Sequence, residues 1–250
     1  MSEITENDIK ILVSGDSISK GVIYDETKSR YIVLPENYVD TISTKIRCSI
    51  KNVSKFGSTI TRGISKLEKH ISKENPDIVL IEYGGNDCAF NWDEVADNPD
   101  ANHLPQTEIK LFETSLHETI ELLKNMKVTP VLMTLPPLNA DKYLEWVSKN
   151  NPLTRGNILK WLGNVTEIYY WQEKYSYVIN KVAEETHTRI IDIRSAFLQL
   201  PDFTKYICKD GMHPNRNGQK LIADKVFDYI KTGYDFLLIE KPSTIMDPRN

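Results

Sequence analysis

Short apolar segments recur along the chain, each bounded by polar or turn-forming residues. Five of them have the length of β-strands: Ile9–Val13, Ile46–Val53, Ile78–Tyr83, Val128–Thr134 and Arg189–Ile193. The third and fourth contain the runs IVLIEY and VTPVLMTL, which are almost continuously apolar. Runs of this kind are typical of parallel strands that are covered on both faces.

Stretches with helical periodicity lie between these segments. Residues Ser58–Ser72 carry apolar side chains spaced four, three and four positions apart, at Ile60, Ile64, Leu67 and Ile71. Similar patterns predict helices over Glu108–Met126, Tyr175–Glu185 and Asn215–Ile230. Strand and helix therefore alternate, which predicts a doubly wound parallel sheet with helices on both faces. No internal repeat or low-complexity linker interrupts the pattern, so we expect a single domain over residues 1–250.

Two segments depart from this alternation. Ala89–Pro105 is a polar loop after the third strand, and Pro136–Tyr170 follows the fourth strand with several helix breakers among its aromatic residues. Both leave the carboxyl end of a predicted strand, the edge at which open α/β sheets bind ligands. A connection as long as 136–170 is usually a lid or a helical insertion. Its aromatic side chains fit ordinary core and a substrate-facing lid equally well. The chain after about residue 234 is expected to be a tail.

The composition and charge of the chain argue against several classes of protein. A net charge of −4, with mixed signs, argues against a nucleic-acid surface, which needs clustered basic residues. The start of the chain, MSEITENDIK, lacks the features of a secretory signal, and no apolar run approaches the roughly 20 residues that span a bilayer. The three cysteines include no CxxC pair, which suggests neither a disulfide framework nor a zinc site. We expect a cytoplasmic protein without an integral membrane segment.

The sequence Gly15-Asp16-Ser17 follows the first strand directly. A serine at this place lies at the carboxyl end of the strand, where the start of a helix supplies N–H groups and positive potential. Taken alone, the triplet has a second interpretation that is at least as good. Asp and Ser are common helix caps.

A second polar motif, DGMHPN, precedes the last predicted helix. A serine hydroxyl becomes a good nucleophile only when a base accepts its proton, and a carboxylate that orients the base improves it. The spacing Asp210-x-x-His213 lets the carboxylate reach one ring nitrogen while the other faces the cleft. The alternative is that Asp210 forms a turn and His213 lies on the surface.

Two further motifs end at the same predicted edge. EYGGND places Asn86 after the third strand, where its amide can donate to an oxyanion, and the glycines before it permit a sharp turn. NVSKFGSTITRG places Gly57 after the second strand, where no side chain screens its N–H. Gly and Asn are ordinary turn residues, so each motif is weak alone. Together, the four motifs supply a nucleophile, a base with its orienting carboxylate, and donors for an oxyanion.

These four motifs resemble, in content, order and spacing, the conserved blocks of the SGNH/GDSL hydrolases. The blocks are Gly15–Ile18, Gly57, Gly84–Asp87 and Asp210–Pro214. The resemblance implies a flavodoxin-like αβα fold of three layers, with five parallel strands in the order 2-1-3-4-5. It also implies Ser17 as nucleophile, His213 as base and Asp210 as its partner. The oxyanion hole would comprise the N–H groups of Ser17 and Gly57 and the side chain of Asn86.

The expected reaction is hydrolysis of a small-molecule acyl ester through an acyl-enzyme, without metal or organic cofactor. Trp and Tyr side chains near the expected cleft suit sugar rings, which favours small acyl groups on a carbohydrate. Acyl transfer, thioester hydrolysis and lysophospholipid hydrolysis by the same site remain open, as does a binding module without catalysis. Cys88, Cys208 and His103 lie near the motifs, but a structural role is expected for each. Asp87 is expected to support its loop.

Overall fold

The five predicted apolar segments form the sheet at the centre of the protein. The computed structural model describes residues 9–239. Its strands are β1 (Lys10–Gly15), β4 (Ser49–Asn52), β5 (Ile78–Glu82), β6 (Thr129–Met133) and β7 (Arg189–Ile191), all parallel, in the order β4-β1-β5-β6-β7. Counted along the chain within this sheet, that order is 2-1-3-4-5. The predicted fold class is therefore confirmed.

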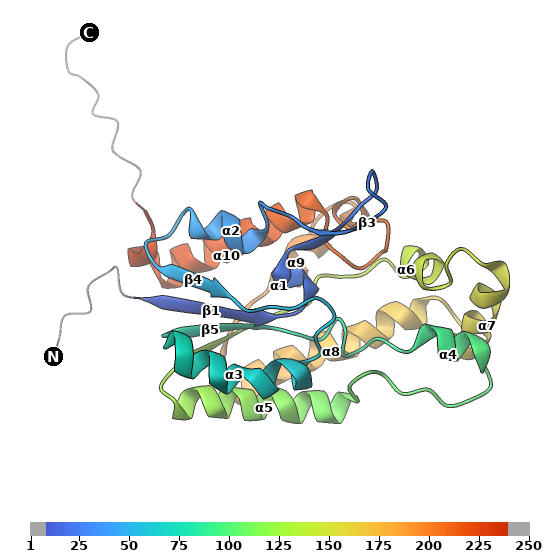
Figure 1. Ribbon diagram of the computed structural model, residues 1–250, viewed down its shortest axis with the longest axis horizontal. Coiled ribbons are helices and arrows are strands. Elements are labelled where there is room, and N and C mark those ends of the chain that lie inside the picture. The colour runs from blue at the N-terminus through green and yellow to red at the C-terminus, as the bar shows by residue number, and fades with distance from the viewer. Residues whose placement is uncertain (1–8, 240–250) are drawn as a thin grey trace, which may run out of the picture.

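Successive side chains of a strand point into the two helical layers. Leu12 belongs to the apolar cluster on one face of the sheet, and Val13 belongs to the cluster on the other. The first face is covered by α3 (Ile60–Glu74), α5 (Ile109–Asn125) and α8 (Thr166–Glu185). The second face is covered by α2 (Tyr38–Ser43), α9 (Ile193–Leu198) and α10 (Arg216–Gly233) (Figure 1). Burial on both faces is the physical reason for the continuous apolar runs of these strands.

Several elements were not predicted from the sequence. The helix start expected at Ser17 is the one-turn helix α1 (Ser17–Lys20), but the antiparallel hairpin that follows it, β2 (Val22–Asp25) and β3 (Arg30–Val33), was not predicted. Helix α8 begins at Thr166, nine residues before its predicted start at Tyr175, because its first turns bury Ile168 against a separate apolar cluster. Helices α2 and α9 and the 3₁₀ turns η1 (Phe203–Tyr206) and η2 (Asp235–Leu237) were not predicted either.

The expected tail does not begin at residue 234. Leu237 is buried in the core, and Leu238 forms an isolated β-bridge with Ile46. The remaining residues, 240–250, lie outside the described part of the chain. So do residues 1–8, on which most of the expectation about a secretory signal rests. Within residues 9–239, no helix is both long and apolar enough to cross a membrane.

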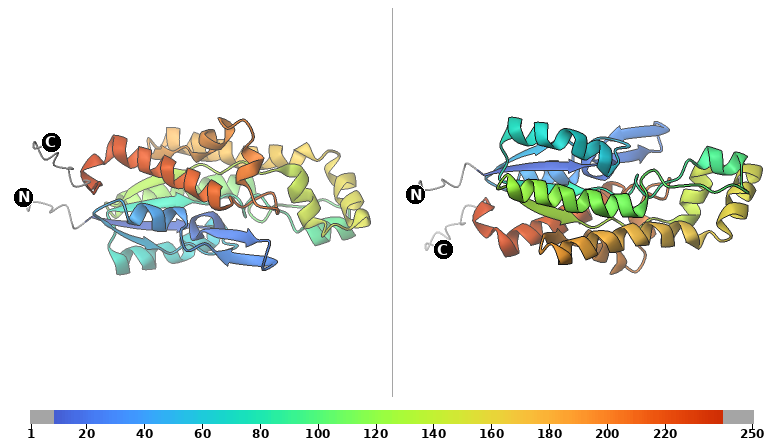
Figure 2. Two further views of the ribbon diagram at one scale, coloured as in Figure 1. Left: turned by 90° about the horizontal axis from the view of Figure 1, so that it is seen from above. Right: turned by 90° about the horizontal axis from the view of Figure 1, so that it is seen from below.

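The two irregular segments fold together beyond the carboxyl ends of the strands. Ala89–Pro105 is not wholly a loop, since it contains α4 (Trp92–Asp97), and 136–170 contains α6 (Ala140–Val147) and α7 (Pro152–Leu162). These helices and the start of α8 enclose a third apolar cluster. Figure 2 shows them gathered at the end of the molecule opposite both chain termini. The segment 136–170 is therefore largely helical and lies beyond the carboxyl ends of the strands.

Candidate active site

Ser17 is the first residue of α1, directly after the end of β1. Asp16 caps this helix, because its Oδ1 accepts a hydrogen bond of 2.8 Å from the N–H of Ile18. A side chain at Gly15 would lie 2.7 Å from the carbonyl oxygen of Glu82. In the GDS triplet, Gly15 therefore allows close packing against β5 and Asp16 caps the helix. Together they hold the buried hydroxyl of Ser17 at the edge of the sheet.

Asp210 and His213 are joined within one tight turn before α10. The Oδ1 atom of Asp210 accepts hydrogen bonds of 3.0 Å from the backbone N–H groups of Met212 and His213. Its Oδ2 atom lies 2.6 Å from the Nδ1 atom of His213. Gly211 adopts a positive φ of 75°, which the turn requires. Both side chains are almost completely buried.

The second ring nitrogen of His213 faces Ser17. Its Nε2 atom lies 2.8 Å from the Oγ atom of Ser17, so one chain of hydrogen bonds connects Asp210, His213 and Ser17. With Nδ1 donating to the carboxylate, Nε2 is left to accept the proton of the hydroxyl. Burial raises the pKa of Asp210, but the hydrogen bond from His213 and its charge outweigh burial and hold that pKa below its usual value. The carboxylate therefore stays ionised beside the imidazole.

Two aromatic rings from other elements flank His213. The ring of Tyr31, on β3, lies 5.2 Å from the imidazole, and the ring of Phe56 lies 6.1 Å away and is nearly parallel to it. Tyr24 and Trp146 extend this group. Burial, and then the nearby carboxylate of Asp210, raise the pKa of Tyr31. Tyr24 and Tyr31 were not expected here, because the hairpin that carries them was not predicted.

Asn86 is brought close to the nucleophile. Its Nδ2 atom donates a hydrogen bond of 3.0 Å to the Oδ2 atom of Asp16, the residue before Ser17. This contact engages one of the two amide hydrogens and leaves the other available.

Gly57 lies in the turn between β4 and α3, with a positive φ of 70°. The N–H of Lys55 donates to the carbonyl of Gly15, which ties this turn to the end of β1. The next residue, Phe56, flanks His213. Within the described residues, the backbone N–H groups of Ser17 and Gly57 donate to no other acceptor. Each is free to bind an oxyanion.

Asp87 holds the loop that carries Asn86. Its two carboxylate oxygens lie 3.0 and 3.2 Å from the N–H of Ile60, at the start of α3, where the N-cap residue Thr59 provides no side-chain cap. Its carbonyl accepts a hydrogen bond from the N–H of Thr107. Burial raises the pKa of Asp87 to about 6. These contacts fit the supporting role expected from the sequence.

A buried pair of acids, Asp16 and Glu82, contacts the short helix that begins at Ser17. The Oε2 atom of Glu82 accepts hydrogen bonds of 3.2 and 2.9 Å from the N–H and hydroxyl of Ser19, while its Oε1 atom has no partner among the described residues. Burial raises the pKa of both carboxyl groups, and the proximity of Asp16 raises that of Glu82 further. Sequence analysis missed Glu82. The signal was one charged residue inside the apolar run IVLIEY.

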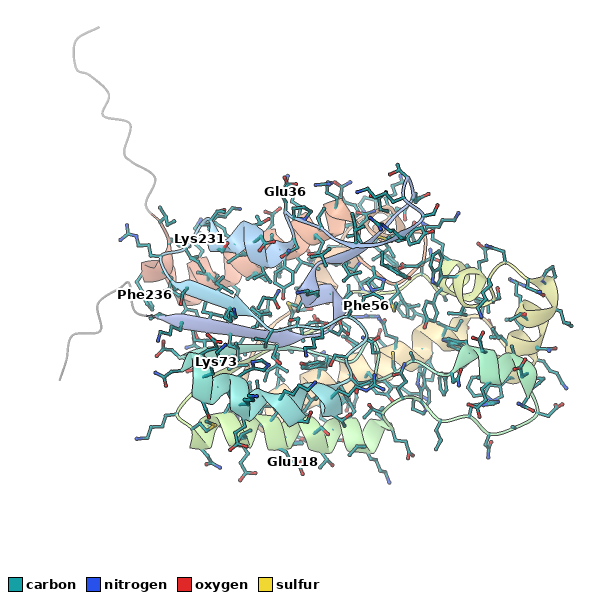
Figure 3. All side chains as sticks on the ribbon, in the orientation of Figure 1. Glu36, Phe56, Lys73, Glu118, Lys231 and Phe236 are labelled. Atoms are coloured by element: carbon teal, nitrogen blue, oxygen red, sulfur yellow. The ribbon has the colours of Figure 1, made fainter. Side chains whose placement is uncertain are left out.

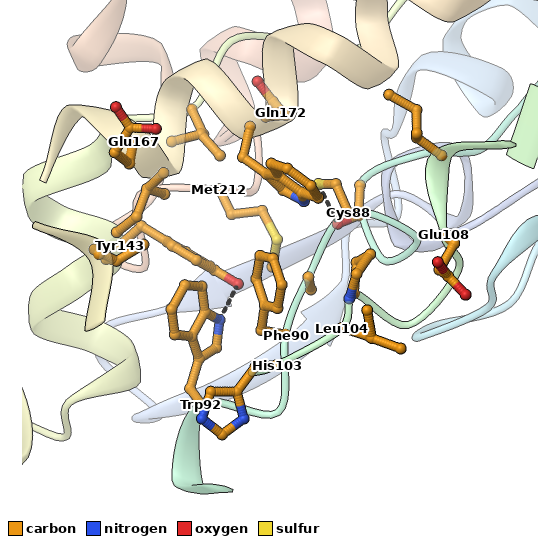
Figure 4. Close-up of a pocket in the computed structure, with 18 of the residues that line it drawn as sticks. Cys88, Phe90, Trp92, His103, Leu104, Glu108, Tyr143, Glu167, Gln172 and Met212 are labelled. Atoms are coloured by element: carbon orange, nitrogen blue, oxygen red, sulfur yellow. Dashed lines mark hydrogen bonds between the residues drawn. The ribbon is translucent and has the colours of Figure 1, made fainter. Parts of the chain in front are cut away.

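A cavity of about 520 Å³ adjoins these residues. Its lining includes Gly85, beside Asn86, and Met212, beside His213, and residues of α4, α6, α7 and α8 form much of its wall (Figure 4). Most of its lining side chains are apolar or aromatic: Phe90, Trp92, Leu104, Ile109, Leu138, Tyr143, Trp161, Leu162, Ile168 and Trp171. Of the aromatic residues of the insertion, Tyr143 and Trp161 belong both to the third apolar cluster and to the cavity wall.

The cysteines near the site are poor nucleophiles. Burial raises the pKa of Cys88, and it raises the pKa of Cys208 to about 12. His103 lies at the cavity, where its ring nitrogen is 2.9 Å from the carbonyl of Asn98.

One surface cluster of the described residues has the composition of a metal site. Glu113, His117 and Glu185 offer three ligand atoms within 4.8 Å of one another. The ammonium group of Lys181 forms ion pairs with both glutamates, so a cation already bridges them. The cluster is an ion-pair network, and it lies outside the residues described above.

Comparison with known proteins gives one consistent result. Residues 13–221 match the GDSL-like Lipase/Acylhydrolase family. The thioesterase 1/protease 1/lysophospholipase L1 of Escherichia coli strain K12 is 22% identical over 86% of this chain and 79% of its own.

Solved structures share the fold. A lipase/acylhydrolase from Enterococcus faecalis superposes with a TM-score of 0.62 at 21% identity, over 90% of this chain and 96% of its own. An acetyl-xylooligosaccharide esterase from Geobacillus stearothermophilus also gives a TM-score of 0.62, at 20% identity, over 93% of this chain and 97% of its own.

Proposed function

The chain belongs to the GDSL-like lipase/acylhydrolase family, and on that premise we propose that it hydrolyses carboxylic esters through Ser17, His213 and Asp210. The observation that carries this proposal is the buried chain of hydrogen bonds from Asp210 through His213 to Ser17, with distances of 2.6 and 2.8 Å. Such a chain is what a serine needs to act as a nucleophile at neutral pH.

The proposed reaction has two steps. His213 accepts the hydroxyl proton as the Oγ atom of Ser17 attacks the ester carbonyl, and the resulting imidazolium is stabilised by the carboxylate of Asp210. When the tetrahedral intermediate collapses, His213 gives this proton to the departing alcohol, and an acyl-enzyme remains. Water then attacks the acyl-enzyme, with His213 again acting first as base and then as acid.

The negative charge of each tetrahedral intermediate needs donors at fixed positions. We assign this role to the N–H groups of Ser17 and Gly57 and to the side chain of Asn86. The support is that both backbone groups are otherwise unpaired in the described residues, and that the hydrogen bond to Asp16 orients the amide of Asn86.

The natural ester substrate is a separate question from the mechanism. The sequence favoured small acyl groups, such as O-acetyl, on a carbohydrate, and the solved acetyl-xylooligosaccharide esterase shares this fold. The Escherichia coli relative is named for thioesterase and lysophospholipase activities. Transfer of the acyl group to an alcohol would use the same acyl-enzyme, and product analysis with added alcohols separates transfer from hydrolysis.

Hydrolysis of p-nitrophenyl acetate and of acetylated sugars tests the proposal. We expect turnover by the wild type and by Ser65→Ala, a control at an exposed serine on α3. Ser17→Ala and His213→Ala should lose nearly all of it. Full activity in Ser17→Ala would refute the proposed mechanism.

A further inference from the structure

The cavity next to the site is much larger than a small acetyl group requires. Its volume of about 520 Å³ lies in the range of about 300–1,000 Å³ that holds whole small-molecule ligands. We propose that it binds the acyl part of the substrate, and that this part is an unbranched hydrocarbon chain of medium length. This inference rests on the proposed ester hydrolysis at Ser17.

The wall of the cavity suits a hydrocarbon and does not suit a sugar. Two polar side chains of its inner lining already have partners, and the buried indole Nε1 atom of Trp171 has none among the described residues. The indole N–H of Trp92 donates to the hydroxyl of Tyr143, and the amide of Gln172 bonds to the carbonyl of Pro136 and to Arg194. The charged lining residues Glu108, Lys110 and Glu167 are exposed and lie at the rim. Sugar hydroxyls in the interior would therefore find few free partners, whereas methylene groups need none.

The position of the cavity indicates that it takes the acyl chain and not the alcohol. Its lining includes Gly85, next to the proposed oxyanion donor Asn86, and Met212, next to the proposed base His213. The alcohol must leave beside the Nε2 atom of His213, because that atom returns the proton. That imidazole is flanked by Tyr31 and by Phe56, whose side chain is largely exposed to solvent. The alcohol side is thus open, and the acyl side leads into the cavity.

The volume sets an upper limit on the chain length, and a chain of medium length lies well within it. If each chain carbon needs about 30 Å³, similar to the share of one molecule in liquid water, eight to ten carbons need about 240–300 Å³. Such a chain fits within the cavity and leaves room for its bends. Each buried methylene should raise kcat/KM about fourfold until the cavity is filled. We therefore expect octanoyl and decanoyl esters to be far better substrates than acetyl esters.

Helix α7 offers a matched pair of variants. Leu162 lines the cavity at the end of this helix, and Leu153 lies near its start with its side chain 75% exposed. Leu162→Trp should fill part of the cavity and lower kcat/KM for p-nitrophenyl decanoate at least tenfold relative to p-nitrophenyl acetate. Leu162→Ala should move the preferred chain to greater length. Leu153→Trp should keep the wild-type profile.

Binding without catalysis provides an independent measurement. Trp92, Trp161 and Trp171 line the cavity, so their fluorescence reports on its occupancy. Decanoate should give a saturable change in the wild type and in Ser17→Ala, and acetate should give none. Decanoate binding without ester turnover would support the acyl cavity and refute the proposed hydrolysis. Ser17-dependent turnover that is highest for acetyl esters and falls with chain length would overturn the acyl cavity and leave the hydrolysis intact.

Discussion

The side-chain amide of Asn86 donates a hydrogen bond to the carboxylate of Asp16, with 3.0 Å between the Nδ2 and Oδ2 atoms. Asp16 precedes Ser17 in the chain, and its other oxygen caps the helix that Ser17 begins. A single carboxylate therefore connects the candidate oxyanion donor to the candidate nucleophile, although 70 residues separate Asp16 from Asn86.

Asp16→Asn tests this connection. The new amide can still accept a hydrogen bond from the N–H of Ile18 through its oxygen, but its NH₂ group would face the NH₂ group of Asn86. Because a misplaced catalytic group lowers the rate strongly, we expect kcat to fall about 10–100-fold with little change in thermal stability. Steady-state kinetics and a thermal melt measure the two effects.

Asn86→Ala and the double variant complete the cycle. Loss of one oxyanion donor should lower kcat by about 10²–10³-fold. Adding Asp16→Asn to Asn86→Ala should reduce kcat little further, because the amide that Asp16 orients is already absent. Independent, multiplying effects would show that Asp16 does not act through Asn86, and near-normal turnover in Asn86→Ala would remove it from the oxyanion hole.

Asp210→Asn should keep the fold and lose most of the activity. The Oδ1 atom would still accept from the N–H groups of Met212 and His213, but an amide NH₂ would face the Nδ1 atom and favour the wrong tautomer of the imidazole. A fall in kcat of about 10³–10⁴-fold is expected. The measurement is single-turnover hydrolysis of an activated ester. A loss of tenfold or less would mean that Asp210 does not orient the base.

Phe56→Ala should affect catalysis more than stability. The ring flanks His213 at 6.1 Å but is 56% exposed, so little buried area is lost with it. Aromatic pairs contribute about 0.5–1.5 kcal/mol, which corresponds to a fall in kcat/KM of about two- to tenfold. Phe236→Ala is the matched control, because Phe236 is 47% exposed and lies at the opposite end of the sheet (Figure 3). Equal kinetics for the two variants would contradict a role for the Phe56 ring at the site.

The buried carboxyl of Asp87 should make stability depend on pH. Burial raises its pKa to about 6 in the folded protein, above the value of about 3.9 in an unfolded chain. The folded state therefore holds this proton more tightly, and the resulting stabilisation is complete below about pH 4 and lost as the pH rises through about 6. The full difference is about 3 kcal/mol.

Urea unfolding between pH 4 and pH 7.5 measures this effect in wild type and in Asp87→Asn. The variant has no proton to lose there, so its free energy of unfolding should rise relative to wild type across the interval. Asp224→Asn, at an exposed position of α10, is the control and should show a much smaller change. A difference between wild type and Asp87→Asn that does not vary with pH would contradict the raised pKa.

The sequence was most informative where burial and local geometry dominate. The continuous apolar runs predicted the parallel sheet, since strands covered on both faces have no polar side to display. Ser17 and the Asp210–His213 pair were predicted because four motifs occur together in the order and spacing of the SGNH/GDSL blocks, although each motif alone fits a helix cap or a turn. The contact between Asp210 and His213 follows from that turn alone, whereas their contact with Ser17 needs the fold.

The features that were missed depend on distant contacts. Each strand of the β2–β3 hairpin has four residues, and of their side chains only that of Val22 is fully buried, so the hairpin lacks the continuous burial that marks the central strands. The extra turns of α8 and the cavity exist because 136–170 packs against α4, which sequence periodicity cannot show. Glu82 was interpreted as an ordinary residue of an apolar strand, because its proximity to Asp16 depends on the fold.

Covalent labelling with a fluorophosphonate, followed by peptide mass spectrometry, tests the central assignment most directly. If Ser17 is the nucleophile, we expect one adduct per chain, on the peptide that contains Ser17. Esterase activity should be lost in proportion to labelling. Ser17→Ala should neither label nor hydrolyse esters. Labelling of another residue in parallel with the loss of activity, or ester hydrolysis that survives in Ser17→Ala, would contradict the assignment of Ser17.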